Sequence, residues 1–429
     1  MFPKWPGYGS RLARMAQASP VASPERLESL DVLRGFALLG ILAMNIRAMA
    51  APFGTYMYPY SLFEYEGASR AAYIFTSIVF DLKMMGLFSM LFGAGVLLYA
   101  SKPTPSGKPP RGLWFRRMFW LLVIGLVHAY LIWDGDILVP YALCGILVLW
   151  WVRRLPAKWL LALSVLFLTV GAGLNVGHGR SWESMSEAQR AQESEFFMPT
   201  PAQTQRQLVA MLGSYADVVA HRAPFVFMAQ TLYFLAFFLW RCAGMMMLGM
   251  ALYKWGFLDG RRSEGTYART AVVCLLLGLS LASYGMIELE GVRFAMPQRT
   301  IADLWNYAGS ALTSVGYAAA LILLVKRGAA AGLRRRLAAV GQMAFSNYLF
   351  HSVVTSVLFL GWGVGLAGRF DYFEQLFVVA AVWTFQLAVS PLWLAQYRFG
   401  PAEWVWRSLT YWQRQPMRRG FDARIGAAT

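Results

Sequence analysis

The chain has 429 residues, of which 58% are hydrophobic and only 14% are charged. Soluble domains usually carry about a quarter charged residues, so this composition excludes an ordinary soluble protein and indicates lipid as the solvent. The net charge of +17 would favour nucleic-acid binding in a soluble protein. Its distribution along the chain indicates membrane topology instead.

Apolar runs of the length that crosses a bilayer recur along the whole chain. They predict ten transmembrane helices, at residues 32–50, 72–100, 118–134, 137–152, 158–176, 225–252, 270–289, 305–325, 340–362 and 374–396. The expected fold class is therefore all-α, a polytopic membrane helical bundle of about ten transmembrane helices.

Two flanking segments complete the predicted organisation. Residues 1–31 lack the compact apolar core of a cleaved signal peptide, so we interpret them as a cytoplasmic N-terminal lead-in. Residues 397–429 combine tryptophans with arginines, which is typical of a cytoplasmic amphipathic tail at the membrane surface. The long external segment 177–224 is polar and predicts a helix over the mouth of the bundle.

The basic residues orient this bundle. If the N-terminus is cytoplasmic, 27 of the 39 Lys and Arg fall in cytoplasmic segments, 9 fall in external ones, and Arg34, Lys83 and Arg241 lie within spans. This asymmetry follows the positive-inside rule. We therefore expect a multipass protein of the bacterial inner membrane with both termini in the cytoplasm, and no nucleic-acid partner.

Ionisable residues within spans are costly and are functional candidates by default. In the first span, Asp31, Arg34 and Asn45 fall on one stripe of a helix. The favoured interpretation is an Asp–Arg clamp at the helix start. The functional alternative is that Arg34 meets an anionic cytosolic ligand while Asn45 lines a path deeper in the membrane.

The second and sixth spans also carry buried charges. The second span either tilts or breaks near Gly86, and its Asp81 and Lys83 point to different sides of a regular helix, so we expect them to have other partners than each other. In the sixth span, Arg241 is expected to snorkel to the cytoplasmic face.

The third span repeats the spacing of the first, because Arg117 and His128 are eleven residues apart on one face. A buried His beside a substrate path is a candidate general base, and a satisfied packing residue is the equally weighted alternative. Asp134 and Asp136 follow in the sequence WDGDIL. On a continuous helix neither reaches His128, so an orienting partner requires a break near Gly135 or another helix. No metal site is expected.

In the ninth span, Asn347, His351 and Thr355 recur every four residues and form one polar face. The favoured interpretation is a hydrogen-bonded seam between helices. The alternative is a substrate contact.

Four stretches of the chain carry a family resemblance. They are RLESLDVLRGFALLGILAMNI at 26–46, LFSMLFGAG at 87–95, GLVHAYLIWDGDILVPYAL at 125–143, and a tail containing VGQMAFSNYLFHS and FGPAEWVWRSLTYWQRQP. These resemble the YeiB family of bacterial multipass membrane proteins, whose C-terminal half contains a domain of unknown function (number 418). The resemblance covers essentially the whole chain. Gln342 stands where the family usually has Arg, and His351 where it usually has Gln.

The YeiB family is similar in layout to membrane acyltransferases that carry acetyl groups from cytosolic acetyl-CoA to a sugar across the membrane. The resemblance implies an acyltransferase-like bundle with a transmembrane acyl-CoA tunnel. Those enzymes place their catalytic His in the loop after the first helix, and here that loop has none.

Two hypotheses follow from these patterns. In the first, a membrane acyltransferase-like protein binds acyl-CoA, its possible co-substrate, through Arg34, Arg117 and Arg241, with His128 as general base near Asp134 and Asp136. In the second, a transporter or exporter of a small polar metabolite uses Lys83, Asp81, Asn347 and His351 as one midplane site. We expect no covalently bound cofactor. The expected partners are the lipid bilayer and acyl-CoA or another small-molecule substrate, and a possible homodimer is left open.

Overall fold

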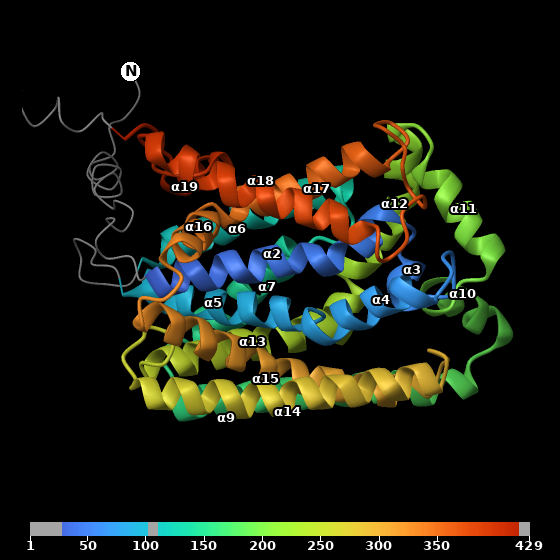
Figure 1. The fold of residues 1–429 in the computed structure, drawn as a ribbon, viewed down its shortest axis with the longest axis horizontal. Coiled ribbons are helices and arrows are strands. Elements are labelled where there is room, and N and C mark those ends of the chain that lie inside the picture. The colour runs from blue at the N-terminus through green and yellow to red at the C-terminus, as the bar shows by residue number, and fades with distance from the viewer. Residues whose placement is uncertain (1–27, 102–109, 420–429) are drawn as a thin grey trace, which may run out of the picture.

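The computed structural model describes residues 28–101 and 110–419, and all regular elements within them are helices (Figure 1). Over these residues, the predicted all-α class is confirmed. Most of the expected lead-in and the last ten residues of the expected tail lie outside the described residues.

Ten apolar segments correspond to the predicted spans. Eight are long and apolar enough to cross a membrane, and two shorter apolar helices, Leu138–Val152 and Ala344–Phe359, accompany them. In chain order the segments are α2 (Glu28–Ala50), α4 (Gly67–Val79) with α5 (Lys83–Ala100), α6 (Arg111–Val127) with η2 (His128–Ile132), α7 (Leu138–Cys144) with η3 (Gly145–Leu149) and α8 (Trp150–Val152), α9 (Ala157–Ser181), α12 (Tyr215–Gln230) with η5 (Phe234–Phe238) and α13 (Leu239–Lys254), α14 (Glu264–Gly291), α15 (Arg299–Lys326), α16 (Ala331–Gln342) with α17 (Ala344–Phe359), and α18 (Gln375–Gln396).

Large apolar side chains face outward along these segments. Leu232 is 67% exposed, Leu276 65% and Leu392 68%. Water would penalise so much exposed hydrocarbon, whereas lipid does not. The chain is therefore a multipass membrane protein.

The helices pack in three tiers between two ends (Figure 1). α9, α14 and α15 form one side, α2, α5 and α13 run through the middle, and α16, α17 and α18 form the opposite side. The start of α2 and the helix α19 (Pro401–Tyr411) lie at the same end, which we call the α19 end.

Glycines allow the middle helices to touch. A methyl group on Gly93 of α5 would lie 2.0 Å from the carbonyl oxygen of Met246, and one on Gly249 of α13 would lie 2.0 Å from that of Met90. The two backbones therefore meet directly, as small residues permit in membrane bundles.

The opposite end carries short helices. They are α3 (Gly54–Met57), η4 (Trp182–Ser184), α10 (Glu187–Phe197) and α11 (Pro201–Met211). The polar segment 177–224 thus forms helices as expected, but several instead of one. Ser186, Thr200 and Ser214 each begin a helix with a capping box, which explains why so polar a segment is helical.

The second span is two helices, and its break differs from the expected position. α4 ends at Val79 and α5 begins at Lys83, while Gly86 is helical. Leu82 takes a left-handed conformation with φ 58° between them. Gly86 is instead a packing position, because a methyl group there would lie 2.6 Å from the Ser314 hydroxyl of α15.

Candidate functional site

α6 ends in a turn that reverses the chain. In the π-helix η2 the backbone N–H of Trp133 donates to the carbonyl of His128 at 2.8 Å, and Trp133 leaves the helix in an extended conformation. A methyl group on Gly135 would lie 2.2 Å from the Trp133 ring, so glycine fits where other residues clash. The reversal carries Asp136 back beside the last turn of the helix. Such π-turns are frequent at functional sites.

His128 is the middle member of three hydrogen-bonded side chains. Its Nδ1 lies 2.8 Å from Oδ1 of Asp136, and its Nε2 lies 2.9 Å from Oγ of Ser352 on α17. Asp136 also accepts the backbone N–H of Val139 at 2.8 Å. In the arrangement with an ionised carboxylate and a neutral imidazole, Nδ1 carries the hydrogen and Nε2 accepts the hydrogen of the Ser352 hydroxyl. We call Asp136, His128 and Ser352 the relay.

The relay is enclosed by protein. The side chains of His128 and Asp136 are each 1% exposed, and Ser352 is 0% exposed. Hydrogen bonds are stronger in such a low-dielectric setting. The same order of groups operates in Ser-His-Asp enzymes, where the carboxylate holds the imidazole in one tautomer and the imidazole removes the hydroxyl proton. The arrangement is therefore suited to activating a hydroxyl.

One face of α17 contacts the turn after α6. Tyr348, Ser352 and Ser356 recur every four residues along this helix, so their side chains share a face. The Tyr348 hydroxyl accepts the backbone N–H of Ile137 at 3.3 Å, and the Ser356 hydroxyl donates to the carbonyl of Ile132 at 3.1 Å. These contacts hold Ser352 against His128.

The structure separates the two predicted aspartates. Asp136 reaches His128 because the chain reverses after Ile132, which corresponds to the first of the two predicted routes, a break near Gly135. Asp134 is half-buried and interacts electrostatically with Arg222 of α12. Burial raises the pKa of Asp134 above its ordinary value, and the positive charge of Arg222 opposes this rise.

Ser352 was not among the predicted residues. The Tyr348, Ser352 and Ser356 repeat was a usable signal, but it lies beside the more conspicuous face of Asn347 and His351.

Arg34 and Arg117 both lie toward the α19 end. Arg34 donates to Asp31 at 2.9 Å, which confirms the predicted clamp, and its side chain is 26% exposed. The Arg117 guanidinium lies 3.6 Å from the ring centroid of Trp406 in α19. Arg34 is close enough to Arg117 to act on it electrostatically, and both side chains are positive, so an anion placed near both would be stabilised. Asn45, further along α2, is half-buried.

The expectation that Arg241 snorkels is wrong. Its side chain is 0% exposed and donates to the carbonyl of Tyr307 at 3.0 Å and to the hydroxyl of Ser310 at 2.5 Å. α13 continues thirteen residues beyond Arg241, to Lys254, which places it roughly 20 Å from that helix end. Arg241 is thus bound by α15 and does not meet a cytosolic phosphate.

Lys83 and Asp81 are bridged by an amide. Lys83 is 0% exposed and donates to the carbonyl of Ser77 at 2.9 Å and to the side-chain oxygen of Asn306. The amide nitrogen of Asn306 donates to Asp81 at 2.8 Å. The two charged residues therefore have a partner on another helix, as expected. We call Lys83, Asn306 and Asp81 the α4–α5 cluster.

Asn347 and His351 form the seam that was the favoured interpretation. Asn347 donates to the hydroxyl of Ser390 on α18 at 3.2 Å, and the His351 imidazole donates to the side-chain oxygen of Gln386 at 2.9 Å. Gln386 in turn donates to the carbonyl of Asn347 at 3.1 Å. The seam bonds to α18 and the α4–α5 cluster bonds to α15, so they are separate hydrogen-bonded groups, and the single midplane site that joins them stays a prediction.

Arg47, near the end of α2, is a buried cation that the sequence analysis did not single out. It is 3% exposed and lies 3.8 Å over the ring of Tyr73, whose backbone carbonyl accepts from it at 2.6 Å. Thr76 and Ser77 accept its remaining hydrogen bonds. Arg47 lies near the end of α2, so the sequence did not predict that α4 packs against its side chain.

Glu403 of α19 holds the start of α17. Its carboxylate accepts the backbone N–H groups of Phe345 at 2.7 Å and Ser346 at 3.2 Å, and it also accepts the Ser346 hydroxyl at 2.5 Å. These amides begin the helix that carries Ser352 and have no intrahelical partner. Burial raises the pKa of Glu403. The tail thus positions α17 from the α19 end.

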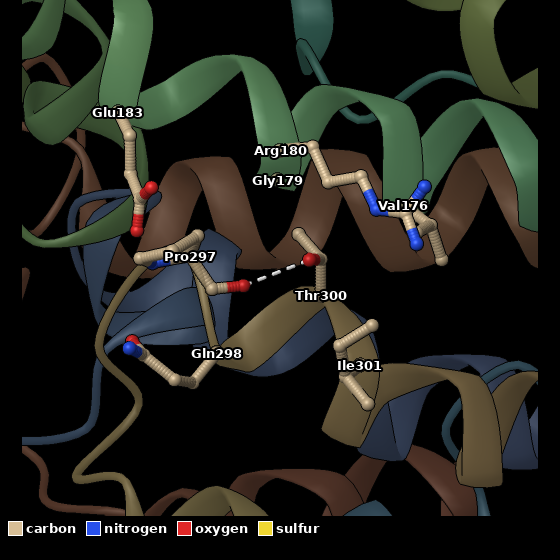
Figure 2. Close-up of a pocket in the computed structure, with 8 residues that line it drawn as sticks. All are labelled: Val176, Gly179, Arg180, Glu183, Pro297, Gln298, Thr300 and Ile301. Atoms are coloured by element: carbon tan, nitrogen blue, oxygen red, sulfur yellow. Dashed lines mark hydrogen bonds between the residues drawn. The ribbon is translucent and has the colours of Figure 1, made fainter.

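A hollow of about 470 Å³ lies at the opposite end, away from the relay. Figure 2 shows it between α9 and the start of α15, with the hydroxyl of Thr300 donating to the carbonyl of Pro297 at 2.8 Å. Its lining residues are Val176, Gly179, Arg180, Glu183, Pro297, Gln298, Thr300 and Ile301. None of the predicted site residues lines it.

The fold and the relay define a polytopic α-helical membrane protein with a buried acid–base chain. Residues 252–413 match the family model "Protein of unknown function (DUF418)". The chain is 31% identical to the protein YeiB of Escherichia coli strain K12, over 90% of this chain and 96% of that protein. It is 28% identical to YxaH of Bacillus subtilis strain 168, over 94% of this chain and 99% of that protein. The chain belongs to the YeiB family.

Proposed function

We propose that this protein is a membrane acyltransferase that moves an acyl group from cytosolic acyl-CoA to an acceptor at the external face of the bacterial inner membrane. The observation that carries the proposal is the relay, in which His128 joins Asp136 and a serine hydroxyl inside the bundle. A buried polar group is costly unless it is hydrogen-bonded, and an enclosed chain of an acid, an imidazole and a hydroxyl is a candidate functional site.

The orientation in this proposal places the α19 end in the cytoplasm. Arginines gather in the connections at that end, including Arg153, Arg154 and Arg334 to Arg336. The positive-inside rule assigns such loops to the cytoplasm. Both ends of the described chain then face the cytosolic pool of acyl-CoA.

The donor would bind through Arg34 and Arg117. Guanidinium groups are well suited to phosphates, because they offer several N–H donors and a fixed charge. His128 lies eleven residues beyond Arg117 on one continuous stretch, which is roughly 16 Å at 1.5 Å per residue. The extended pantetheine arm of CoA spans a distance of this order, so a thioester could reach the relay while its nucleotide stays at the α19 end.

The acceptor would approach from the opposite end. The turn that carries Asp134 connects α6 and α7 there. His128 would remove a proton from a hydroxyl, and the carboxylate of Asp136 would stabilise the resulting imidazolium. In the conformation described here the relay is closed on all sides, so substrates require the helices around it to open.

The test uses the purified full-length protein in lipid nanodiscs. Acetyl-CoA and octanoyl-CoA are offered separately, and thermal stabilisation and CoA release are measured. We expect wild type to be stabilised and to release CoA slowly, His128→Ala to bind without release, and Arg34→Ala to need more acyl-CoA for the same stabilisation. Absence of both stabilisation and release in wild type would contradict the proposal.

A second candidate function is export or transport of a small polar metabolite. The α4–α5 cluster favours it, because Lys83 lies at a break between two half-helices, and transporters build midplane sites at such breaks. Cryo-EM density for a small solute beside Lys83, in protein that neither binds nor cleaves acyl-CoA, would favour this candidate over acyl transfer.

A further inference from the structure

We propose that Ser352 is the nucleophile that carries the acyl group as a covalent ester between donor and acceptor. This inference rests on the proposed acyl transfer and specifies its route. Ser352 Oγ lies 2.9 Å from Nε2 of His128, and its side chain is 0% exposed. A hydroxyl beside an imidazole that is itself oriented by a carboxylate has the geometry of an activated nucleophile.

The two hydroxyls that follow Ser352 on α17 bond differently. Thr355 donates to the carbonyl of His351, four residues earlier, at 2.7 Å, and Ser356 donates to the carbonyl of Ile132 at 3.1 Å. Ser and Thr in membrane helices commonly satisfy themselves on backbone carbonyls in this way. Ser352 bonds to the imidazole instead, so a packing role does not account for its arrangement as it does for the two others.

The first half-reaction balances within the relay. The Ser352 oxygen attacks the carbonyl carbon of the acyl-CoA thioester while its proton moves to Nε2 of His128. The tetrahedral intermediate then collapses, the carbon–sulfur bond breaks, and the departing CoA sulfur takes the proton from the imidazolium. The products are acyl-Ser352 and free CoA thiol, and His128 returns to its starting state.

The second half-reaction runs in the reverse sense with a different oxygen. An acceptor hydroxyl gives its proton to Nε2 of His128 and attacks the ester carbonyl. The bond between the carbonyl carbon and Ser352 Oγ breaks, and Oγ takes the proton back. The acyl group is now on the acceptor, and no oxidant, reductant or further reactant is consumed.

Trp133 supplies an unused donor beside this chemistry. Its side chain is 7% exposed, and its indole N–H has no hydrogen-bond partner among the described residues. The centroids of its ring and the His128 ring are 6.3 Å apart. A buried N–H donor without a partner costs free energy, and it is available to the oxyanion of the tetrahedral intermediate.

A covalent intermediate also suits a site reached from two ends. CoA can leave toward the α19 end before the acceptor arrives from the other end, so the bundle never opens to both sides at once. Direct transfer would require both substrates to occupy the enclosed relay together.

The experiment traps this intermediate. Full-length protein in nanodiscs is incubated with acetyl-CoA or octanoyl-CoA without acceptor, quenched with acid and digested, and the peptides are examined by mass spectrometry. We expect an acyl group on Ser352 that hydroxylamine removes. Ser352→Ala should lose the label, while the control Thr355→Val, whose hydroxyl bonds only to backbone carbonyls of its own helix, should keep it. Ser352→Cys should carry the acyl group as a thioester on the replacement residue.

The outcomes separate this inference from the function on which it rests. Transfer that survives in Ser352→Ala but fails in His128→Ala would overturn the covalent route and leave acyl transfer by direct attack standing. Absence of CoA release in wild type with both donors would sink both. Thermal unfolding of each variant shows whether the variant is folded. Ser352→Cys provides a second readout because it keeps a nucleophile of similar size.

Discussion

The relay and the α4–α5 cluster are both buried polar networks at interruptions of a helix, yet their partners differ. In the cluster, Lys83 Nζ donates to the carbonyl of Ser77 beside the break between α4 and α5. Tyr317 and Ser314 of α15 donate to the carbonyls of Val79 and Lys83 at 3.0 and 2.8 Å. At the carbonyls of Ser77 and Val79, which precede the break, these side chains replace hydrogen bonds that an unbroken helix would make with itself.

In the relay, by contrast, the bonds join side chains to one another. His128 uses both ring nitrogens on the side chains of Asp136 and Ser352. The backbone takes part only through the N–H of Val139, which donates to Asp136. Burial alone therefore does not distinguish the two networks. The partners do, because the relay joins a carboxylate, an imidazole and a hydroxyl, whereas the cluster includes a bond to a backbone carbonyl beside a helix break.

The largest expected effect is loss of activity in Asp136→Asn. An amide can donate toward Nδ1, which disfavours the tautomer that activates Ser352, and it no longer neutralises the imidazolium. We expect CoA release to fall by about 10²–10⁴-fold. Asp371→Asn makes the same chemical change in the loop before α18 and should retain the wild-type rate. Equal rates of CoA release in Asp136→Asn and wild type would contradict the functional role proposed for the relay and, with it, the contrast with the α4–α5 cluster.

A change in the α4–α5 cluster should lower the stability of the protein. Lys83→Met removes the cation that bridges Ser77 and Asn306 and leaves Asp81 without its indirect counter-charge, at a cost on the order of 3 kcal/mol. Denaturant unfolding in detergent measures the loss. Lys158→Met changes an exposed lysine at the start of α9 and should cost little. A Lys83→Met protein as stable as wild type would argue against the repair role assigned to the cluster.

Glu403 tests the support of the relay from the α19 end. Glu403→Ala leaves the N–H groups of Phe345 and Ser346 without their acceptor, so we expect a loss of about 1–3 kcal/mol, measured by thermal or denaturant unfolding. Glu403→Gln keeps an acceptor oxygen and should lose less. If the two variants lose equally, hydrogen bonding to α17 is not what Glu403 contributes.

The same residue predicts a pH dependence. Because burial raises the folded-state pKa of Glu403, the folded protein holds this proton more tightly than the unfolded chain does. Stability from this group is full below the ordinary Glu pKa of about 4.3 and is lost as pH rises through the raised value. Glu403→Gln should remove that component, which a comparison of unfolding curves across this window would reveal.

The smallest effect is expected in the seam. His351→Gln can still donate to the side chain of Gln386, so we expect a change in unfolding free energy within about 1 kcal/mol. His351→Leu leaves the Gln386 oxygen unpaired and should cost about 1–3 kcal/mol. A larger loss for the glutamine variant than for the leucine variant would show that the seam depends on the imidazole itself.

The stretches that carried the family resemblance meet in space. Gly341 of VGQMAFSNYLFHS packs against the backbone of Asp31, since a methyl group there would lie 1.9 Å from its carbonyl oxygen. Glu403 of the tail bonds to Ser346, and His128 bonds to Ser352. Sequence reasoning recognised each stretch separately. Their convergence on α17 could not be derived, because no periodicity links segments hundreds of residues apart.

The sequence by itself determined the spans, the asymmetry of positive charge and the polar faces of the helices. These depend on hydrophobic length and helical period, which are local properties of the chain. It also identified His128 and showed that an orienting partner had to come through a break near Gly135 or from another helix. Only the tertiary structure decided the partners: the π-turn brought back Asp136 instead of Asp134, and α17 presented Ser352 from 224 residues away. It also enclosed Arg241 and Arg47, because burial depends on which helices pack together.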